Sequence, residues 1–582
     1  MFLNARRITI RFLLLVIPAL ASGLVSGALA DDSGTCARPA AASAVFNPSE
    51  VRSENGVLRV DLTYRNSVDS KGRMRYCYVD GEGREAPTLR VHPGDQVILT
   101  LKNDVALPSA PMEMAGHVSA ASPMSSECGG GAMMRSATNL HFHGLMIPPT
   151  CHQDDVLATL IDPSSPPFEY KFKIPEDQPP GLYWYHPHVH GFTKEQVLGG
   201  ASGALIVEGI ENAVPQLAGL PDRVFVVRDE NLANPNAMPT GSAASVPPAV
   251  LDRDGDAVNT GTGTGTPAKD LSINFVPVPY PDYPPAIIRM KPKERQLWRV
   301  LNASAITYLN LQVVFNGVAQ PVGVVGLDGS PIPENGLRGQ QILWLTHLGV
   351  PPGGRVEFVV NGPPLRVKAE LVTRSVNTGP IGENDPARPL ATIVASRDAA
   401  EPTPLPASTG SAPVQTEAWL GNVKPVRVRR LYFSEKPQDP GNPAGPADFY
   451  LTVEGQQPKL FDPSSSTPNI VVRQGDVEDW IIENRSREVH AFHIHQVRFL
   501  LLEWYGIPVN EPYLRDTINV PFWDGVTTKY PEVKVRVDFR DPNSVGTFVY
   551  HCHILEHEDG GMMGTIRVES PANTSPKKGS HP

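Results

Sequence analysis

Three stretches of the chain repeat one order of apolar and polar positions. Residues 89–103, 288–302 and 470–484 align without gaps, and each has an extended start, a polar turn and an alternating strand that ends at Asn. Alternation with a period of two is typical of half-buried β-strands. The copies are separated by the length of whole domains rather than by the roughly 20–50 residues of solenoid repeats. The pattern therefore predicts three β domains, over residues 45–210, 215–395 and 420–570.

A second repeat links only the first and third of these domains. Residues 181–188 read as a strand that ends in His-Pro-His, and a returning strand follows at 203–207. Residues 546–553 and 564–568 repeat this layout with His-Cys-His. A strand, a loop that carries functional side chains and a returning strand are typical of Greek-key sandwiches. We therefore predict an all-β fold of three Greek-key β-sandwich domains, which agrees with the 60 prolines and 50 glycines of the chain.

The remaining segments are predicted to be an export signal, a linker and a tail. Residues 1–30 combine a basic start, an apolar run and a small-residue cleavage site, as in a signal peptide. The mature protein is then periplasmic or secreted and has no membrane span; a retained membrane anchor is the alternative. Residues 396–419 have the Ala/Pro/Ser/Thr-rich composition of a linker, and residues 571–582 are expected to be a disordered tail.

The net charge of the chain bears on its partners. Three of the 51 basic residues and none of the 61 acidic residues lie within residues 1–30, so the mature chain has 48 basic residues and a formal charge of −13. A chain with this balance is not expected to bind nucleic acid.

The five cysteines are best divided into one metal ligand and two disulfides. If Cys552 binds a metal, Cys36, Cys77, Cys128 and Cys151 remain as an even set, compatible with two disulfides in an exported protein. Three connectivities are open. Proximity in the sequence favours the pairs 36–77 and 128–151.

The histidines indicate metal sites. Ten of the 16 histidines fall in four clusters: His141 and His143; His186 and His188; His490, His493 and His495; and His551, His553 and His557. In an extended segment, alternate side chains share one face, so each His-x-His places two imidazoles together. One such pair could equally be two histidines of a core, and copper, zinc and iron all accept imidazole. Four clusters in corresponding places of two repeats favour metal binding.

The last cluster indicates copper. Cys552, His557 and Met562 follow one another at intervals of five residues, and His490 lies upstream on another expected strand. Two imidazoles, a thiolate and a weak thioether are the ligands of a blue-copper electron-transfer site. Zinc does not use a thioether ligand. A structural buried cysteine is the alternative for Cys552, but a histidine on each side argues against it.

The four motifs closely resemble those of the multicopper oxidases, and the resemblance covers essentially the whole mature chain. They are His141-Phe142-His143-Gly144, His186-Pro187-His188, His490-x-x-His493-x-His495, and His551-Cys552-His553 with His557 and Met562. The resemblance implies three cupredoxin-like domains and four copper ions per chain, three of them in a trinuclear cluster between the first and third domains. The second domain has His347 as its single histidine and is expected to be a copper-free spacer.

The resemblance also implies a ligand set for each copper. Type 1 copper would be held by His490, Cys552, His557 and Met562, and type 2 copper by His141 and His493. The type 3 pair would be held by His143, His186, His188, His495, His551 and His553. Electrons from a reductant would enter at type 1 copper and pass from Cys552 to its neighbours His551 and His553. Four electrons would then reduce O2 to two waters.

Oxygen reduction consumes protons, which directs attention to three carboxylates. Glu558, Asp154 and Asp155 resemble acids that supply protons in the family. For Asp154 and Asp155 the alternative is a solvated surface position. His190 extends the second motif but has no counterpart in the family pattern, so it is expected beside the ligands or on the surface.

The reducing substrate is left open by the sequence. A laccase-like oxidase of phenols or aryl amines is the leading hypothesis. The methionines between Met112 and Met134 suggest a cuprous or other metal-ion oxidase as the alternative, because thioethers favour Cu(I). That segment could equally be a flexible loop. A copper-binding protein without turnover and a copper nitrite reductase fit the complete ligand set less well.

Overall fold

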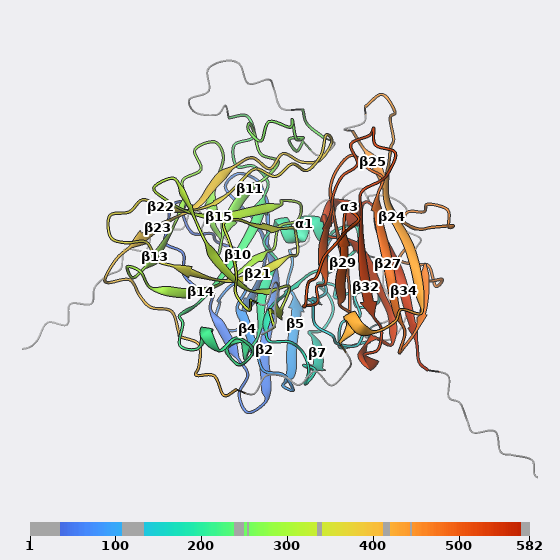
Figure 1. The fold of residues 1–582 in the computed structure, drawn as a ribbon, viewed down its shortest axis with the longest axis horizontal. Helices are drawn as coiled ribbons and strands as arrows, with labels where there is room; N and C mark the ends of the chain where they lie inside the picture. The colour runs from blue at the N-terminus through green and yellow to red at the C-terminus, as the bar shows by residue number, and fades with distance from the viewer. Residues whose placement is uncertain are drawn as a thin grey trace, which may run out of the picture.

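The structure is a computed structural model that describes residues 35–106, 128, 133–237, 250–252, 255–333, 340–410, 419–442 and 445–571. Its regular structure is nearly all strand and forms three successive pairs of sheets (Figure 1). The predicted all-β class is therefore confirmed. The expected signal peptide, residues 572–582 of the tail and most of the methionine-rich segment lie outside the described residues. We call the parts built on the three sheet pairs domains 1, 2 and 3.

Domain 1 contains a five-stranded and a four-stranded sheet. The first has the order β1 (Glu50–Arg52), β4 (Thr88–Val91), β9 (Gly203–Val207), β8 (Gly181–His186), β6 (His141–His143). The second has the order β3 (Met74–Asp80), β2 (Val57–Val68), β5 (Gln96–Asn103), β7 (Phe168–Lys173). Along β7, buried and exposed residues alternate, as expected of a strand with one face on a core.

Domain 2 also contains two sheets, and both have more strands than the sheets of domain 1. One sheet has the order β12 (Val276–Val278), β11 (Asp270–Ile273), β10 (Asp222–Glu230), β14 (Arg295–Asn302), β21 (Arg355–Asn361), β17 (Val322–Leu327), β18 (Ser330–Pro331), and β19 (Leu343–Leu345) also pairs with β17. The other has the order β13 (Ala286–Met290), β23 (Arg388–Ala395), β22 (Ala369–Thr373), β15 (Leu309–Phe315), β16 (Val318–Gln320), and β20 (Leu348–Val350) also pairs with β15.

Domain 3 repeats the plan of domain 1. One sheet has the order β25 (Ala447–Val453), β24 (Arg427–Pro437), β27 (Val477–Asn484), β32 (Glu532–Asp538), β29 (Phe499–Trp504), β30 (Ile507–Pro508). The other has the order β26 (Ile470–Arg473), β34 (Met563–Glu569), β33 (Gly546–Cys552), β28 (His490–Ile494), β31 (Thr517–Val520). The β33–β34 pair is antiparallel, like β8–β9 in domain 1, as the second sequence repeat predicts.

The threefold repeat of the sequence connects the two sheets of each domain. Its copies become β4 and β5, β13 and β14, and β26 and β27, and in every copy the two strands belong to different sheets. Each copy ends at a buried asparagine, Asn103, Asn302 or Asn484. The side-chain amide of each asparagine donates to two main-chain carbonyls of nearby loops. The repeated asparagine thus satisfies loop carbonyls that would otherwise be buried without a donor.

The structure has a few short helices, and two of them follow loops that carry histidine. The helices are α1 (Thr193–Leu198), α2 (Ile210–Ala213) and α3 (Leu555–Asp559), with 3-10 turns η1 (Pro215–Leu217), η3 (Leu420–Asn422) and η4 (Pro542–Ser544). In Figure 1, α1 of domain 1 and α3 of domain 3 lie close together. The Asp559 carboxylate accepts hydrogen bonds from the main-chain N–H groups of Gly191, Thr193 and Lys194 at 2.8–3.2 Å. This contact joins domains 1 and 3 beside the histidine-bearing loops.

The structure forms both disulfides that proximity in the sequence favours. Cys36 is bonded to Cys77 and Cys128 to Cys151, which confirms the favoured pairing and leaves Cys552 as a free, buried thiol. Among the described residues, no helix is both long and apolar enough to cross a membrane.

Candidate metal centre

All twelve metal ligands expected from the sequence are buried. The ten clustered histidines, Cys552 and Met562 are each at most 2% exposed. The histidines lie on or just after the ends of four strands, β6, β8, β28 and β33, and on α3. Isolated surface histidines are therefore excluded as an explanation of the motifs.

Strand register brings the histidines of each domain together. His141 on β6 pairs directly with His186 on β8, and His493 on β28 pairs with His551 on β33. The two domains then meet face to face. The His141 ring stacks on that of His495 with centroids 3.7 Å apart, and the His143 ring stacks on that of His493 at 3.8 Å. Eight histidines from domains 1 and 3 form one cluster, which we call the interdomain cluster: His141, His143, His186, His188, His493, His495, His551 and His553.

The interdomain cluster divides into three overlapping groups. Within each group the candidate ligand atoms all lie within 4.8 Å of one another. The groups are His143, His186 and His553; His188, His495 and His551; and His141, His143 and His493. All three groups take their histidines from both domains, so neither domain could assemble any of them alone. We call the first two, which share no histidine, the mixed groups.

Contacts at one ring nitrogen leave the other nitrogen facing the cluster. His141 Nδ1 lies 3.0 Å from Asp154, His186 Nδ1 is 2.9 Å from the Pro187 carbonyl and His493 Nδ1 is 2.8 Å from the Asp516 carbonyl. The Nε2 atoms of these three histidines are buried and have no hydrogen-bond partner. His143 is reversed, because its Nε2 lies 3.2 Å from Asp516 and its Nδ1 is the atom without a partner. Outer contacts of this kind fix the tautomer of metal-binding histidines.

Other nitrogens of the cluster face one another directly. His551 Nε2 lies 3.3 Å from His188 Nε2 and 3.2 Å from His495 Nε2. Burial, with a smaller contribution from neighbouring histidines, lowers the pKa of His143, His186, His493, His495 and His553 well below the ordinary value. The same causes lower the pKa of His188 to about 3, although Glu558 opposes them. Neutral imidazoles with converging, unpartnered nitrogens are the ligand form that copper binds. The residues of the interdomain cluster therefore fit a cluster of copper ions.

A second group of ligands lies within domain 3. His490 Nδ1 and His557 Nδ1 are 3.1 Å apart, and Cys552 Sγ lies 3.6 Å from the first and 3.7 Å from the second. His490 comes from β28, Cys552 from the end of β33 and His557 from α3. A thiolate and two imidazoles that converge in this way match the trigonal ligand set of a blue-copper site.

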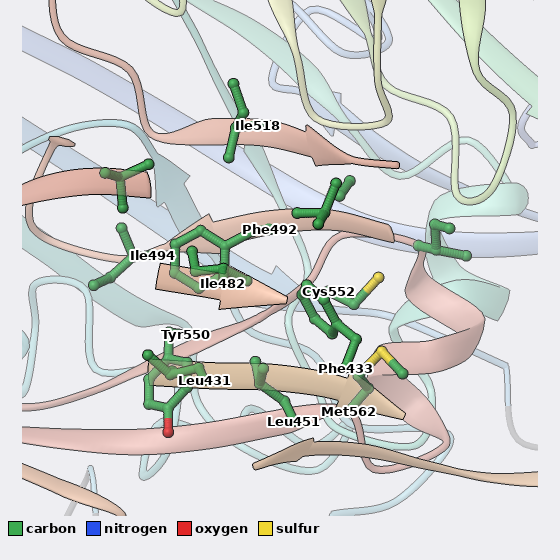
Figure 2. Packing of buried hydrophobic residues seen from close by; sticks show 14 of the residues in the cluster. Leu431, Phe433, Leu451, Ile482, Phe492, Ile494, Ile518, Tyr550, Cys552 and Met562 are labelled. Atoms are coloured by element: carbon green, nitrogen blue, oxygen red, sulfur yellow. The ribbon is translucent and has the colours of Figure 1, made fainter. Parts of the chain in front are cut away.

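Met562 lies beside this group. The Cys552 N–H donates to the Met562 carbonyl at 3.1 Å, and the Met562 N–H donates to the His557 carbonyl at 2.8 Å. Figure 2 shows the sulfur atoms of Cys552 and Met562 together at one end of the domain 3 core, which also contains Phe433, Leu451 and Phe492. This apolar surrounding fits a weak thioether ligand and excludes water from the group.

Two of the three expected acids contact the interdomain cluster. Glu558 is fully buried, and its Oε2 lies 3.0 Å from His551 Nδ1. Burial alone raises the pKa of Glu558, but its interactions with the neighbouring His188 and His551 rings, including a hydrogen bond with His551, outweigh burial and lower it below its ordinary value. Asp154 is 1% exposed, contacts His141 Nδ1 and accepts a hydrogen bond from Gln496 of domain 3 at 2.5 Å.

Asp155 differs from its neighbour. Its carboxylate accepts a hydrogen bond from the Ala158 N–H at 3.1 Å. Burial and the nearby charge of Asp154 raise its pKa above the ordinary value. No hydrogen bond or ion pair with a histidine is recorded for Asp155 among the described residues.

Three sequence features fall outside both groups of ligands. His190 is partly buried and its ring packs against Phe461 with centroids 4.9 Å apart, while His347 is exposed and contacts Asn310. Met133 and Met134 are the described methionines of the methionine-rich segment, and Met134 is 42% exposed. That His190 and His347 are not ligands stays a prediction.

One residue at the interdomain cluster, Asp516, was not predicted from the sequence. It is fully buried, its carboxylate contacts His143 and its main-chain carbonyl contacts His493. Asp516 lies just before β31, which pairs with β28 so that Thr517 faces His493. A single aspartate without a neighbouring ligand motif has no spacing signal, so only this strand pairing reveals it.

Carboxylates also surround the blue-copper ligands. Glu435 lies 3.3 Å from His490 Nε2, and Glu488 lies 3.1 Å from His557 Nε2. Both line a cavity of about 40 Å³ that reaches His557, together with Asp252, Glu383 and Glu556. We call this cavity the acidic pocket. The Glu435 side chain is 7% exposed, and its Oε1 is the atom that faces His490 Nε2.

Comparison with known proteins places these features in a family. Two family models, both described as multicopper oxidase, match residues 132–212 and 440–572. These ranges contain every candidate ligand. A multicopper oxidase of Staphylococcus epidermidis is 25% identical over 439 residues, which are 74% of this chain and 76% of the relative. A laccase of Bacillus subtilis is 23% identical over 473 residues, 75% of this chain and 80% of the relative.

Solved structures share the fold along nearly the whole chain. A multicopper oxidase from Campylobacter jejuni, described as a metallo-oxidase, superposes with a TM-score of 0.61 at 22% identity and covers 91% of this chain and 96% of its own. A variant of a multicopper oxidase from Aquifex aeolicus superposes with a TM-score of 0.62 at 18% identity and covers 90% of this chain and 99% of its own. These neighbours confirm three cupredoxin-like domains.

Proposed function

The chain belongs to the multicopper oxidase family, and we propose that it couples four one-electron oxidations of a reducing substrate to the reduction of O2 to two waters. In this proposal four electrons, four protons and one O2 yield two waters, so no partly reduced oxygen is released. Bound copper supplies the electron transfer and the binding of oxygen. The residues of the chain hold the copper ions, connect the two sites and move protons.

The proposed sites follow the groups of the structure. Type 1 copper is assigned to His490, Cys552, His557 and Met562, and type 2 copper to His141 and His493. The two type 3 coppers are assigned to the two mixed groups, one with His143, His186 and His553 and the other with His188, His495 and His551. The four-copper count rests on this division.

One observation carries the proposal. Cys552 belongs to the domain 3 group, while its chain neighbours His551 and His553 belong to the two different mixed groups of the interdomain cluster. A single tripeptide therefore connects the site that would receive electrons with both sites that would use them. Glu558 contacts His551 at the same place, which supports a role in moving protons to oxygen.

Copper content, spectra and oxygen uptake test the proposal together. We expect four copper ions per chain, the intense blue absorption of a copper–thiolate bond, and oxygen uptake on addition of a reductant. Cys552→Ser is the matched variant, since it removes one sulfur and should abolish the blue absorption while the other copper ions remain. A copper-loaded protein that consumes no oxygen with phenolic, cuprous or ferrous donors would overturn the proposal.

The acidic pocket supports a metal cation as the electron donor. His490 and His557 are at most 1% exposed, and the Phe449 ring stacks on His557 with centroids 4.4 Å apart, so an aromatic substrate has no open imidazole edge to contact. The pocket volume of about 40 Å³ is far below the roughly 150 Å³ of a cavity that binds benzene. Oxygen ligands suit a divalent cation such as Mn(II) or Fe(II) better than Cu(I).

Electron transfer from such a cation needs a short connection to type 1 copper. Glu435 and Glu488 line the acidic pocket and also contact the ring nitrogens of His490 and His557 that face away from Cys552. Each carboxylate thus joins the pocket to one copper ligand. A divalent cation would lose one electron there and leave as the trivalent ion. The phenols of a laccase and Cu(I) are the competing donors.

Glu383 offers a test that leaves the copper ligands untouched. It lines the acidic pocket and belongs to domain 2, and Glu383→Gln replaces its carboxyl group with a neutral amide of nearly the same size, which cannot bind a cation through a carboxylate. We expect KM for Fe(II) or Mn(II) to rise about tenfold while kcat for a phenol stays constant. Glu82→Gln, which removes an exposed carboxylate of domain 1, is the control for net charge. Equal KM values for the metal ions in all three proteins would contradict a cation site, and phenol turnover alone would favour the laccase hypothesis.

Export remains part of the proposal. The two disulfides support an oxidising compartment, because cytosolic proteins rarely keep such bonds. The periplasm or the cell exterior is therefore the proposed location.

A further inference from the structure

A buried arginine of domain 2 reaches the interdomain cluster. Arg355 begins β21, is 1% exposed, and donates two hydrogen bonds to Asp516, from Nη1 at 2.7 Å and from Nη2 at 2.5 Å. This is the two-pronged geometry that makes arginine–carboxylate pairs strong and directional. Among the described residues, domain 2 supplies no histidine to the cluster. Through Arg355 it supplies a positive charge beside the cluster instead.

Asp516 connects Arg355 to candidate ligands of two different coppers. Its Oδ1 lies 3.2 Å from Nε2 of His143, a histidine of domain 1, and its main-chain oxygen lies 2.8 Å from Nδ1 of His493, a histidine of domain 3. Thr517 Oγ1 donates to the same carboxylate at 2.8 Å. One residue thus sets which nitrogen of each histidine faces the cluster.

The backbone of domain 1 packs closely against this pair. A Cβ on Gly144, which follows His143 with φ +88°, would lie 2.6 Å from Arg355 Nη2 and 2.7 Å from Asp516 Oδ2. A Cβ on Gly353 would lie 2.8 Å from the His553 ring. Arg355 Nε also donates to the Leu182 carbonyl on β8 of domain 1 at 3.2 Å. All three domains therefore meet at the Arg355–Asp516 pair.

We infer that Arg355 is a positioning residue of the trinuclear site, through which the copper-free domain controls the orientation of His143 and His493. The inference rests on the proposed copper cluster. A buried carboxylate that loses its hydrogen-bonded positive partner is no longer held in its orientation. Loss of Arg355 would therefore release the contacts that Asp516 makes with both histidines, and loss of such outer contacts weakens metal binding by about 10–100-fold.

Two substitutions of Arg355 separate charge from geometry. Arg355→Met removes the charge, and we expect at least about tenfold weaker retention of copper at the trinuclear site and an altered type 2 copper EPR signal. Arg355→Lys keeps a positive charge but cannot form the two parallel hydrogen bonds, so its loss of copper should be smaller. The blue absorption per chain should stay constant in both variants, because Arg355 does not contact the type 1 ligands.

Arg299 provides the matched control. It is a fully buried arginine of domain 2 that pairs with Asp222 at 2.8 Å and with Glu357. Neither of these partners is a residue that contacts a candidate histidine ligand in the sites described above. Arg299→Met should lower the stability of the protein without changing the type 2 EPR signal.

Several outcomes decide the inference. If Arg355→Met does not fold, an altered type 2 signal in Arg355→Lys still supports it. A wild-type signal and copper content in Arg355→Lys would overturn it, and so would the same spectral change in Arg299→Met. If the wild-type protein binds blue copper and consumes oxygen, and the Arg355 variants match it in copper content and type 2 signal, the inference about Arg355 is wrong and the proposed function stands. A wild-type protein without copper would refute the proposed function, and this inference with it.

Discussion

Asp154 and Asp155 are adjacent in the chain, yet the structure gives them different surroundings. Asp154 contacts His141 of domain 1 and Gln496 of domain 3, whereas Asp155 accepts a hydrogen bond from a turn N–H group. Glu558, although separated from both by some 400 residues of chain, contacts His551 in the same cluster. Substitutions of the three acids are therefore expected to affect proton supply to different extents.

Glu558→Gln is expected to slow oxygen reduction. The substitution keeps the side-chain size and removes the group that could take up and pass on a proton, so kcat should fall by about 100-fold. Reduction of type 1 copper by the donor should be unaffected, because Glu558 contacts His551 and not Cys552. Stopped-flow reoxidation of the fully reduced enzyme by O2, followed by the return of the blue absorption, measures the step directly.

Asp155→Asn is the comparison for this prediction, since it neutralises an acid at the same end of the molecule that does not contact a histidine. Its effect on reoxidation should be at least about ten times smaller than that of Glu558→Gln. Equal rates in the Glu558 variant and the wild type would show that protons reach oxygen by another group.

The spacing of residues in the sequence predicted the histidines but not their outer contacts. Every His-x-His pair has ring centroids between 5.1 and 6.0 Å apart, as alternation along an extended chain requires. Arg355 and Asp516 are 161 residues apart and belong to different domains. No local pattern connects them, because their contact depends on how whole domains dock. Residues of this kind become visible only in the folded structure.

At the scale of elements, periodicity predicted the strands of the repeated segments. The repeated segments become strand pairs that cross between sheets, and the strands before the His-Pro-His and His-Cys-His turns return as antiparallel partners. These features are local, because alternation and turn residues lie within about twenty residues of one another. The domain boundaries derived from the repeats stay a prediction, although the strands of each sheet pair fall within them.

The short helices were not predicted, and they matter for the ligands. β33 ends at Cys552, and α3 begins at Leu555, so His557 returns to Cys552 through a helical turn rather than along a strand. The interval of five residues was visible in the sequence, but its conformation was not. A helix of five residues has too few positions to show a helical period.

At the scale of the whole molecule, function depends on contacts between domains. The domain 3 core also includes Ala305, Ile306 and Tyr308 from domain 2. The Leu555 N–H at the start of α3 donates to the Ala305 carbonyl, and the Val489 N–H beside His490 donates to the Thr378 carbonyl, both at 2.8 Å. Domain 2 therefore supports the loops on both sides of the type 1 ligands, which sequence periodicity has no means of predicting.

Asp385 holds the domain 2 side of this interface. Its carboxylate accepts a hydrogen bond from the Tyr308 N–H at 2.9 Å, and its main-chain carbonyl accepts one from Val376 at 3.0 Å. Burial raises the pKa of Asp385 to about 7, and the charge of Arg388 offsets only part of that rise. The folded protein therefore keeps Asp385 protonated at pH values where the unfolded chain, with the ordinary value of 3.8, has lost the proton.

This difference predicts how stability depends on pH. Between pH 3.8 and about 7, the folded state binds a proton that the unfolded state does not, so the contribution of Asp385 to stability falls as pH rises and is lost above about 7. Asn cannot ionise, so the free energy of unfolding of Asp385→Asn relative to wild type should increase with pH, by about 1.4 kcal/mol per unit within this window. Urea unfolding of both proteins at about pH 5 and about pH 7 measures the change. Asp398→Asn, at an exposed position just after β23, should show a constant difference. A constant difference for Asp385→Asn as well would mean that this carboxylate is ionised in the folded protein, and that the interface beside the type 1 ligands tolerates its charge.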